Sequence, residues 1–268
     1  MSAPSGAPKL AVRDLRKVFD DRRSGEVVAL DGADFEIAEK EFVTVIGTSG
    51  CGKSTMLSII AGLEEETEGD VLVDGEHVLA PGRDRGVVFQ SYTLFPWLTA
   101  QKNVEFALRG PSRERARIAR EHLDLVGLEH FADAYPSQLS GGMRQRVAIA
   151  RALSYKPEVL LMDEPFGALD AQTRQLMQEL LTKVWEEHRL TVMFVTHDID
   201  EAVFLSDRVL VMTARPGRIK EELRIAIDRP RTFEIFSTPE FFEYKARLLK
   251  SVREESLRSA EAMEEVIA

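Results

Sequence analysis

The sequence lacks several features that define other classes of protein. It has a single cysteine, Cys51, so no disulfide can form within the chain and a reducing compartment is the simplest home. No stretch approaches about eighteen consecutive apolar residues, so we expect the chain not to cross a membrane by itself. Residues 1–8 lack the basic and apolar regions of a signal peptide, and we predict a disordered tail there.

Basic residues are also in the minority. The chain has 35 lysines and arginines against 45 aspartates and glutamates, a formal net charge of −10, and its sequence pI is near 5.2. A nucleic-acid surface usually requires a basic domain, so we expect no nucleic-acid partner. The 268 residues, 44% of them hydrophobic, can form the core of one large α/β domain or of a domain with a subdomain.

A glycine-rich stretch follows the apolar run 42–46 and precedes a helical pattern. It fits the phosphate-loop spacing Gly-x-x-x-x-Gly-Lys-Ser/Thr in the strand-to-helix context that this motif requires. Glycines let several backbone N–H groups point into one concavity, and the positive end of the following helix strengthens the anion site. We expect Lys53 to reach the β- and γ-phosphates of a nucleotide and Ser54 to ligate Mg²⁺; a plain glycine-rich turn is the alternative. The stretch consists of Gly47, Thr48, Ser49, Gly50, Cys51, Gly52, Lys53, Ser54 and Thr55.

Cys51 lies inside this loop, next to the start of the predicted helix. A helix N-terminus tends to lower the pKa of a thiol. We therefore expect alkylation of Cys51 to block nucleotide binding and the bound nucleotide to protect it. A small residue that fills space is the alternative.

Strand and helix patterns organise the rest of the chain. From residue 91 to residue 157 the pattern is mainly helical, which predicts an all-helical subdomain inserted into a sheet domain. The predicted fold class is α/β: a phosphate-loop NTPase core with a mostly parallel sheet, an antiparallel β patch at the N-terminus and the inserted helical subdomain. Strands are expected at residues 9–18, 27–30, 35–37, 42–46, 71–73, 77–79, 86–89, 159–162 and 191–195, and a terminal hairpin at 208–212 and 217–227.

Polar side chains follow three of these strands, where ligand-facing groups of α/β sheets collect. Asp163 and Glu164 end the apolar strand 159–162, and they point in different directions because side chains alternate along a strand. We expect Asp163 to hold Mg²⁺ beside Ser54 and Glu164 to orient and polarise the attacking water; an acidic turn is the alternative. Gln90 and His197 end two further strands, although a lone histidine is more often structural.

Two more features suggest nucleotide contacts. Ser140 is a good N-cap, and Gly141 and Gly142 leave the N–H groups of the next helix unobstructed, which makes a second anion site. Capping alone explains such a sequence in most proteins. Phe19 ends the first strand and could stack on a base or pack in the core; its position leaves both interpretations open.

With these residues assembled, the chain resembles the ATPase subunit of ATP-binding cassette (ABC) transporters from about residue 9 to residue 212. Each matching motif stands at a predicted strand end or helix start, in the family's order. Gly47–Thr55 is similar to the Walker A loop, Gln90 to the Q-loop, Leu139–Met143 to the signature, Val159–Glu164 to Walker B, Ala168–Asp170 to the D-loop and His197 to the switch histidine.

The resemblance implies a head-to-tail pair of copies that encloses two ATP molecules with Mg²⁺. Ser140, Gly141 and Gly142 of one copy would contact the γ-phosphate held by Lys53 and Ser54 of the other. Phe19 would stack on adenine, where tyrosine is common, and Met143 replaces a frequent glutamine of the signature. Implied catalytic residues are Glu164, His197, Lys53 and Gln90, and implied metal ligands are Ser54, Gln90 and Asp163.

Residues 89–99 and 196–219 resemble the corresponding segments of importers for nitrate, sulfonates and taurine. They also resemble those of uptake systems for thiamine precursors and related small molecules. We then expect a peripheral protein at the cytoplasmic face of the plasma membrane, with a membrane permease docking near Tyr92 to Leu98 and an extracytoplasmic solute-binding protein acting indirectly. Residues 9–232 would form the ATPase domain and 233–268 a helical extension. The alternatives are a soluble ABC ATPase without a permease and a regulatory module.

Overall fold

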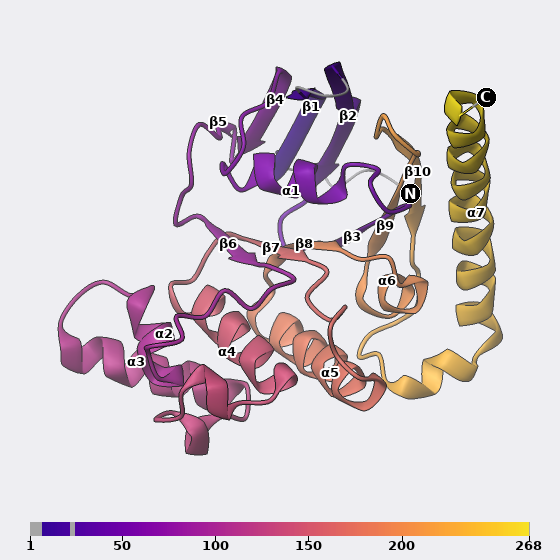
Figure 1. Cartoon of the computed structure of the whole chain (residues 1–268). Helices are drawn as coiled ribbons and strands as arrows, with labels where there is room; N and C mark the ends of the chain where they lie inside the picture. Colours follow the sequence, from indigo (N-terminus) through magenta and orange to yellow (C-terminus); the bar gives the residue numbers. More distant parts are fainter. Residues whose placement is uncertain (1–6, 22–24, 268) are drawn as a thin grey trace. The chain divides into compact units, whose positions relative to one another are not determined.

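The computed structural model describes residues 7–21 and 25–267 and divides the chain into two compact units (Figure 1). The first unit joins residues up to Gly82 to those from Leu190 onward, and the second contains residues 83–189. Residues 1–6 of the predicted disordered tail lie outside the described residues.

The first unit begins with an antiparallel sheet. Along its strand β2, buried Ala33, Phe35 and Ile37 alternate with exposed Asp34 and Glu36, so one face packs on the core and the other meets solvent. The predicted strands 27–30 and 35–37 form one strand, whose pairing with the neighbouring β1 shifts register between them. In sheet order the strands are β2 Gly25–Ile37, β1 Leu10–Asp21, β4 Glu68–Val73 and β5 Glu76–His77.

A second group of strands in this unit is mostly parallel. Strand β3 pairs in parallel with β8 on one side and with β9 on the other, and β10 pairs antiparallel with β9. Every residue of β3 and β8 is buried, which accounts for their unbroken apolar runs, because a strand covered on both faces does not alternate. The strands are β3 Phe42–Ile46, β8 Thr191–Val195, β9 Arg208–Met212 and β10 Ile219–Arg224.

The helices of the first unit lie against these strands. Helix α7 covers most of the predicted helical extension, residues 233–268. It runs beside β9 and β10 (Figure 1) and buries Phe241 and Leu248, which are seven residues apart on one helix face. The helices are α1 Lys53–Ile60, α6 Ile199–Leu205, the short 3-10 helix η3 Phe233–Ser237 and α7 Pro239–Ile267.

The second unit combines a parallel strand pair with helices. Strand β6 Arg85–Val88 pairs with β7 Val159–Asp163. Helices α2, α3 and α4 share one apolar core that includes Val104, Leu123 and Val147. With the sheets of the first unit, this arrangement confirms the predicted α/β class. The helices are α2 Ala100–Phe106, α3 Ser112–Leu125, η1 Glu129–Phe131, η2 Pro136–Gln138, α4 Gly141–Ser154 and α5 Ala171–His188.

Candidate functional site

The phosphate loop, residues 47–55, connects the end of β3 to the first turn of α1. Gly50 and Gly52 have φ angles of +76° and +101°, the left-handed region that favours glycine, so the sharp turn into α1 depends on them. A Cβ on Gly52 would also lie 2.8 Å from Leu30 Cδ2 and 2.9 Å from the Ala29 carbonyl oxygen. Backbone conformation and close packing on β2 therefore fix the shape of the loop.

Lys53 folds back over this loop. Its Nζ donates hydrogen bonds to the carbonyl oxygens of Gly47 at 2.9 Å and Thr48 at 3.0 Å, and the residue is buried. A positive charge therefore lies at the positive end of α1, and a phosphate there would be attracted by both. Ser54 stands in the first turn of α1 and is exposed. The phosphate and Mg²⁺ roles of these two residues stay predictions.

The expectation of a lowered thiol pKa at Cys51 is wrong. The residue is only 1% exposed, and burial raises the pKa of its thiol despite the opposing effect of the Lys53 ammonium, whose Nζ lies 3.9 Å from Sγ. Desolvation disfavours the thiolate more than the nearby cation and helix end favour it. The alternative interpretation, a small residue that fills space beneath the loop, fits this burial.

We expect N-ethylmaleimide to modify Cys51 in the native protein at least about tenfold more slowly than in the urea-unfolded protein at pH 8. The raised pKa leaves less thiolate, and burial blocks access. Because Cys51 is the single cysteine, mass spectrometry of the intact chain measures this reaction without ambiguity. Equal rates in the native and unfolded chains would contradict the buried position.

His197 lies at the same edge of the first unit as the phosphate loop. Strands β3 and β8 run parallel with Val45 opposite Val195, so their carboxyl ends meet at that edge. His197 is exposed there. The next residue, Asp198, caps α6 by accepting hydrogen bonds from the N–H groups of Asp200 at 2.8 Å and Glu201 at 3.2 Å. The cap fixes the backbone that presents His197.

Phe19 lies on β1, opposite Val27 of β2. Its residue is 37% exposed, and Lys17 Nζ lies 4.8 Å from the ring centroid. A half-exposed aromatic ring beside a cation has free surface for a planar ligand, whereas a core residue would be covered. The geometry favours stacking over core packing, and the adenine contact stays a prediction.

In the second unit, Gln90 and Glu164 converge on Gly167. Strands β6 and β7 are parallel with Val88 opposite Met162, so the residues that follow them lie at one edge. A Cβ placed on Gly167 would lie 3.6 Å from Gln90 Nε2 and 3.7 Å from Glu164 Oε2. An amide and a carboxylate therefore share one small space, and their roles as Q-loop and general base stay predictions.

Ser140 caps α4, as predicted. Its Oγ accepts a hydrogen bond from the Met143 N–H at 3.3 Å, and the side chain is exposed. A Cβ on Gly142 would lie 2.2 Å from Thr173 Cγ2 of α5, so a larger residue here would require the Thr173 side chain to move. Gly141 faces the Tyr92 hydroxyl, which would be 3.0 Å from its added Cβ. The anion-binding role of this helix end stays a prediction.

One group near the phosphate loop was not anticipated as part of the site. The turn between β9 and β10, residues 213–218, lies against the loop through Arg215 and Gly217. In the sequence, these residues indicate only the subfamily. The Arg-Pro-Gly run was the available signal, but nothing in it indicates which segment it contacts.

No helix in the part of the chain that the structure describes is long and apolar enough to cross a membrane.

Comparisons with known proteins agree on one family. Residues 30–167 match the sequence profile of the family described as ABC transporter. An uncharacterised ABC transporter ATP-binding protein of Methanocaldococcus jannaschii is 56% identical over 94% of each chain. The nitrate import ATP-binding protein NrtD of Synechocystis sp. is 48% identical over 95% of this chain and 98% of its own. The solved dimeric post-hydrolysis structure of the ATP-binding cassette MJ0796 with ADP and Pi has a TM-score of 0.73 and 38% identity, covering 82% of this chain and 100% of that one.

Proposed function

Because the chain belongs to the ABC transporter family, we propose that it energises the import of a small solute through a separate membrane permease. The chain is an ATPase. The observation that carries the proposal is the phosphate loop, where the Lys53 ammonium and the start of α1 come together. The strong similarity to a nitrate import protein supports the direction of transport.

ATP is the nucleotide expected at this loop. Backbone N–H groups of the phosphate loop other than that of Cys51, which donates to the Thr48 carbonyl, would bind the phosphates together with the Lys53 ammonium. Phe19 would stack on the adenine. His197 would contact the γ-phosphate from the end of β8. These contacts bind and orient the nucleotide but supply no base for the attacking water.

Mg²⁺ suits the proposed ligands Ser54, Gln90 and Asp163. They offer a hydroxyl, an amide oxygen and a carboxylate, the hard oxygen donors that Mg²⁺ prefers alongside substrate phosphates. The ion, when bound, neutralises charge on the β- and γ-phosphates. Glu164 would accept a proton from the attacking water, and Gln90, beside the same Gly167, would help to orient that water.

A second copy of the chain completes the proposed site. Ser140, Gly141 and Gly142 place a helix N-terminus where an anion is favoured, and one such end is a weak anion site by itself. In a head-to-tail pair, these residues of each copy would contact the γ-phosphate on the other. The similar cassette of known structure is dimeric and holds ADP and Pi, which supports this arrangement.

An aromatic cluster in the second unit is the proposed permease contact. Trp97 and Phe106 are 70% and 65% exposed, and the Phe95 ring lies between them, with centroids 5.6 Å and 4.5 Å away. Buried Asn103 holds this segment, because its Nδ2 donates to the Phe95 carbonyl at 3.2 Å and to the Leu98 carbonyl at 3.0 Å. Exposed aromatic groups on a fixed backbone suit a short apolar helix of the permease.

Trp97→Ala is expected to weaken permease binding about tenfold or more, since buried tryptophans are frequent hot spots at interfaces. Basal ATP hydrolysis by the isolated protein should stay unchanged, because Trp97 is outside the nucleotide-binding residues. Phe131→Ala, which removes another exposed aromatic of the same unit, is the matched control and should leave permease binding intact. Equal permease binding by wild type and Trp97→Ala would reject this surface.

The test of the function is reconstitution. The chain should co-purify with a permease from membranes, and its ATPase rate in proteoliposomes should rise when the solute-binding protein is loaded. Nitrate, an alkanesulfonate and taurine, tested separately, identify the solute class. If the protein is recovered only from the soluble fraction, and the permease does not change its ATPase rate, a soluble ABC ATPase is favoured instead.

A further inference from the structure

The turn between β9 and β10 touches the phosphate loop directly. Gly217 is buried against it, and a Cβ on Gly217 would lie only 2.1 Å from the Cys51 carbonyl oxygen. Arg215 Nε donates a hydrogen bond to the Gly50 carbonyl oxygen at 3.4 Å. The 213–218 turn therefore meets two consecutive carbonyl groups of the loop.

The turn itself is firmly built. Gly217 donates its N–H to the Ala29 carbonyl at 2.9 Å and accepts from the Asp31 N–H at 3.1 Å, so it bridges to β2. Thr213 Oγ1 donates to the Pro216 carbonyl at 2.9 Å and accepts from the Arg218 N–H at 3.0 Å. A displacement of this turn would also displace the phosphate loop, because Gly217 packs directly against the Cys51 carbonyl.

Helix α7 holds the other side of the turn. Glu255 is only 1% exposed, and its Oε2 accepts a hydrogen bond from the Ala214 N–H at 3.0 Å. Its Oε1 pairs with Lys220 Nζ at 2.9 Å and Arg258 Nη1 at 3.0 Å. A buried carboxylate with three partners is costly to disturb, since removing it leaves donors without their acceptor.

Glu255 is ionised at neutral pH. Burial raises the pKa of its carboxyl, but hydrogen bonds from Lys220 and the Ala214 N–H together with nearby positive charges outweigh this, so the net pKa lies below its ordinary value. The carboxylate that accepts these bonds is therefore lost only as the pH falls through that lowered pKa.

We propose that Glu255 and Arg215 are positioning residues for the phosphate loop, so that α7 sets the affinity of the loop for nucleotide. The reason is the planarity of the peptide bond: the Cys51 carbonyl and the Gly52 N–H share one rigid plane and point in opposite directions. Because the 213–218 turn holds the Cys51 carbonyl on the outside of the loop, the Gly52 N–H points to the side where the phosphate would bind. The Gly50 carbonyl likewise shares a plane with the Cys51 N–H. That N–H donates a hydrogen bond to the Thr48 carbonyl at 3.3 Å and closes the loop.

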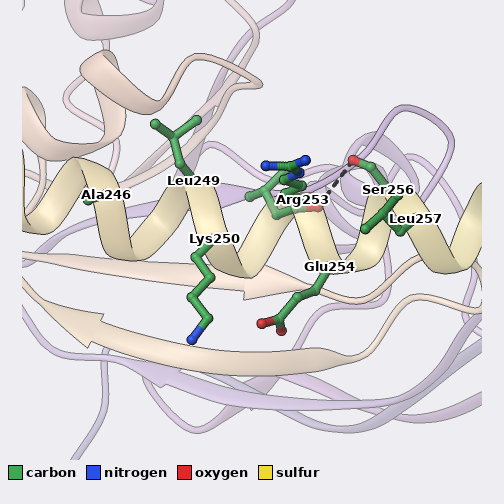
Figure 2. A pocket seen from close by; sticks show the side chains of 8 residues that line it. Ala246, Leu249, Lys250, Arg253, Glu254, Ser256 and Leu257 are labelled. Atoms are coloured by element: carbon green, nitrogen blue, oxygen red, sulfur yellow. Dashed lines mark hydrogen bonds between the residues drawn. The ribbon is translucent and has the colours of Figure 1, made fainter.

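The inference rests on the proposed ATP site at the phosphate loop and extends it to α7. Neighbouring Glu254 supplies a matched control. It also pairs with Lys220, at 2.9 Å, but it is exposed and lines a pocket formed by residues of α7 (Figure 2). Changing Glu254 removes the same charge one residue away without touching the 213–218 turn.

The test measures the Kd of a fluorescent ATP analogue with Mg²⁺ on the full chain. Glu255→Ala should raise the Kd about tenfold, Glu255→Gln should recover part of the loss, and Glu254→Ala should match wild type. At saturating ATP, kcat should be retained while KM rises, which general unfolding would not produce. Circular dichroism checks that each variant is folded.

Arg215→Ala keeps the proposal testable if Glu255→Ala fails to fold, because Arg215 is exposed. It should raise the Kd about threefold to tenfold with an unchanged Tm, and Arg215→Lys should recover part of that loss. Wild-type affinity in folded Glu255→Ala or in Arg215→Ala, or an equal loss in Glu254→Ala, would overturn the proposal. If the wild-type chain binds no ATP analogue, the proposed function fails instead.

Discussion

Glu164→Gln is expected to lower kcat for ATP hydrolysis about 10²- to 10⁴-fold while ATP still binds, the range that a positioned general base contributes. Glutamine keeps the shape of the side chain but cannot take up the proton of the attacking water. The backbone at Glu164 has φ +42°, in the left-handed region, a costly conformation for a side chain that concentrates at functional sites. Its Oε2 also shares the space beside Gly167 with the Gln90 amide.

Because Glu164→Gln hydrolyses ATP slowly, we also expect it to remain in the ATP-bound dimer. With ATP present, Glu164→Gln should accumulate as a dimer, which size-exclusion chromatography with light scattering measures, whereas the wild type turns over and separates. Glu158→Gln changes an exposed carboxylate just before the opposite end of β7 and should hydrolyse ATP like wild type. Wild-type turnover by Glu164→Gln would show that another group activates the water.

Lys53→Ala is expected to raise the Kd for ATP about 10²-fold, since charge-assisted hydrogen bonds to phosphate are among the strongest single contacts. The ammonium already lies against the loop on the Gly47 and Thr48 carbonyls, so little reorganisation is needed to reach a bound phosphate. Isothermal titration calorimetry with ATP and Mg²⁺ measures the change. The contrast with Glu164→Gln is diagnostic, because one variant loses binding and the other loses turnover.

Damage to the fold of the loop must be separated from the effect of the lost charge. Removing Lys53 leaves two carbonyls without their donor, so thermal unfolding without nucleotide should accompany the titration. Lys40→Ala, which removes an exposed lysine from the turn before β3, is the matched control and should keep wild-type affinity. If Lys53→Ala binds ATP as tightly as wild type, the phosphates bind elsewhere.

Several site residues of the second unit can be predicted from the sequence. Ser140 is predicted as an N-cap from its place before a helical pattern, and it accepts the expected backbone N–H of Met143 at 3.3 Å. Caps depend on three or four consecutive residues, so sequence alone contains them. Gln90 and Glu164 both lie beside Gly167 because the strands that precede them, β6 and β7, are parallel neighbours and end at the same edge. Predicting this contact requires knowledge of the strand pairing in addition to the local sequence.

The sequence by itself determined what short-range spacing and side-chain period control. The phosphate loop, the buried runs of β3 and β8 and the family resemblance belong here, because glycine conformation and strand burial act over a few residues.

Tertiary structure decided the properties that depend on distant partners. Cys51 has a raised pKa because the folded chain buries it, and a local helix end could not reveal that. In the sequence, Glu255 is one of several charged residues in the predicted helical extension. Only the fold brings its carboxylate to the Ala214 N–H and the Lys220 ammonium, about forty residues away along the chain.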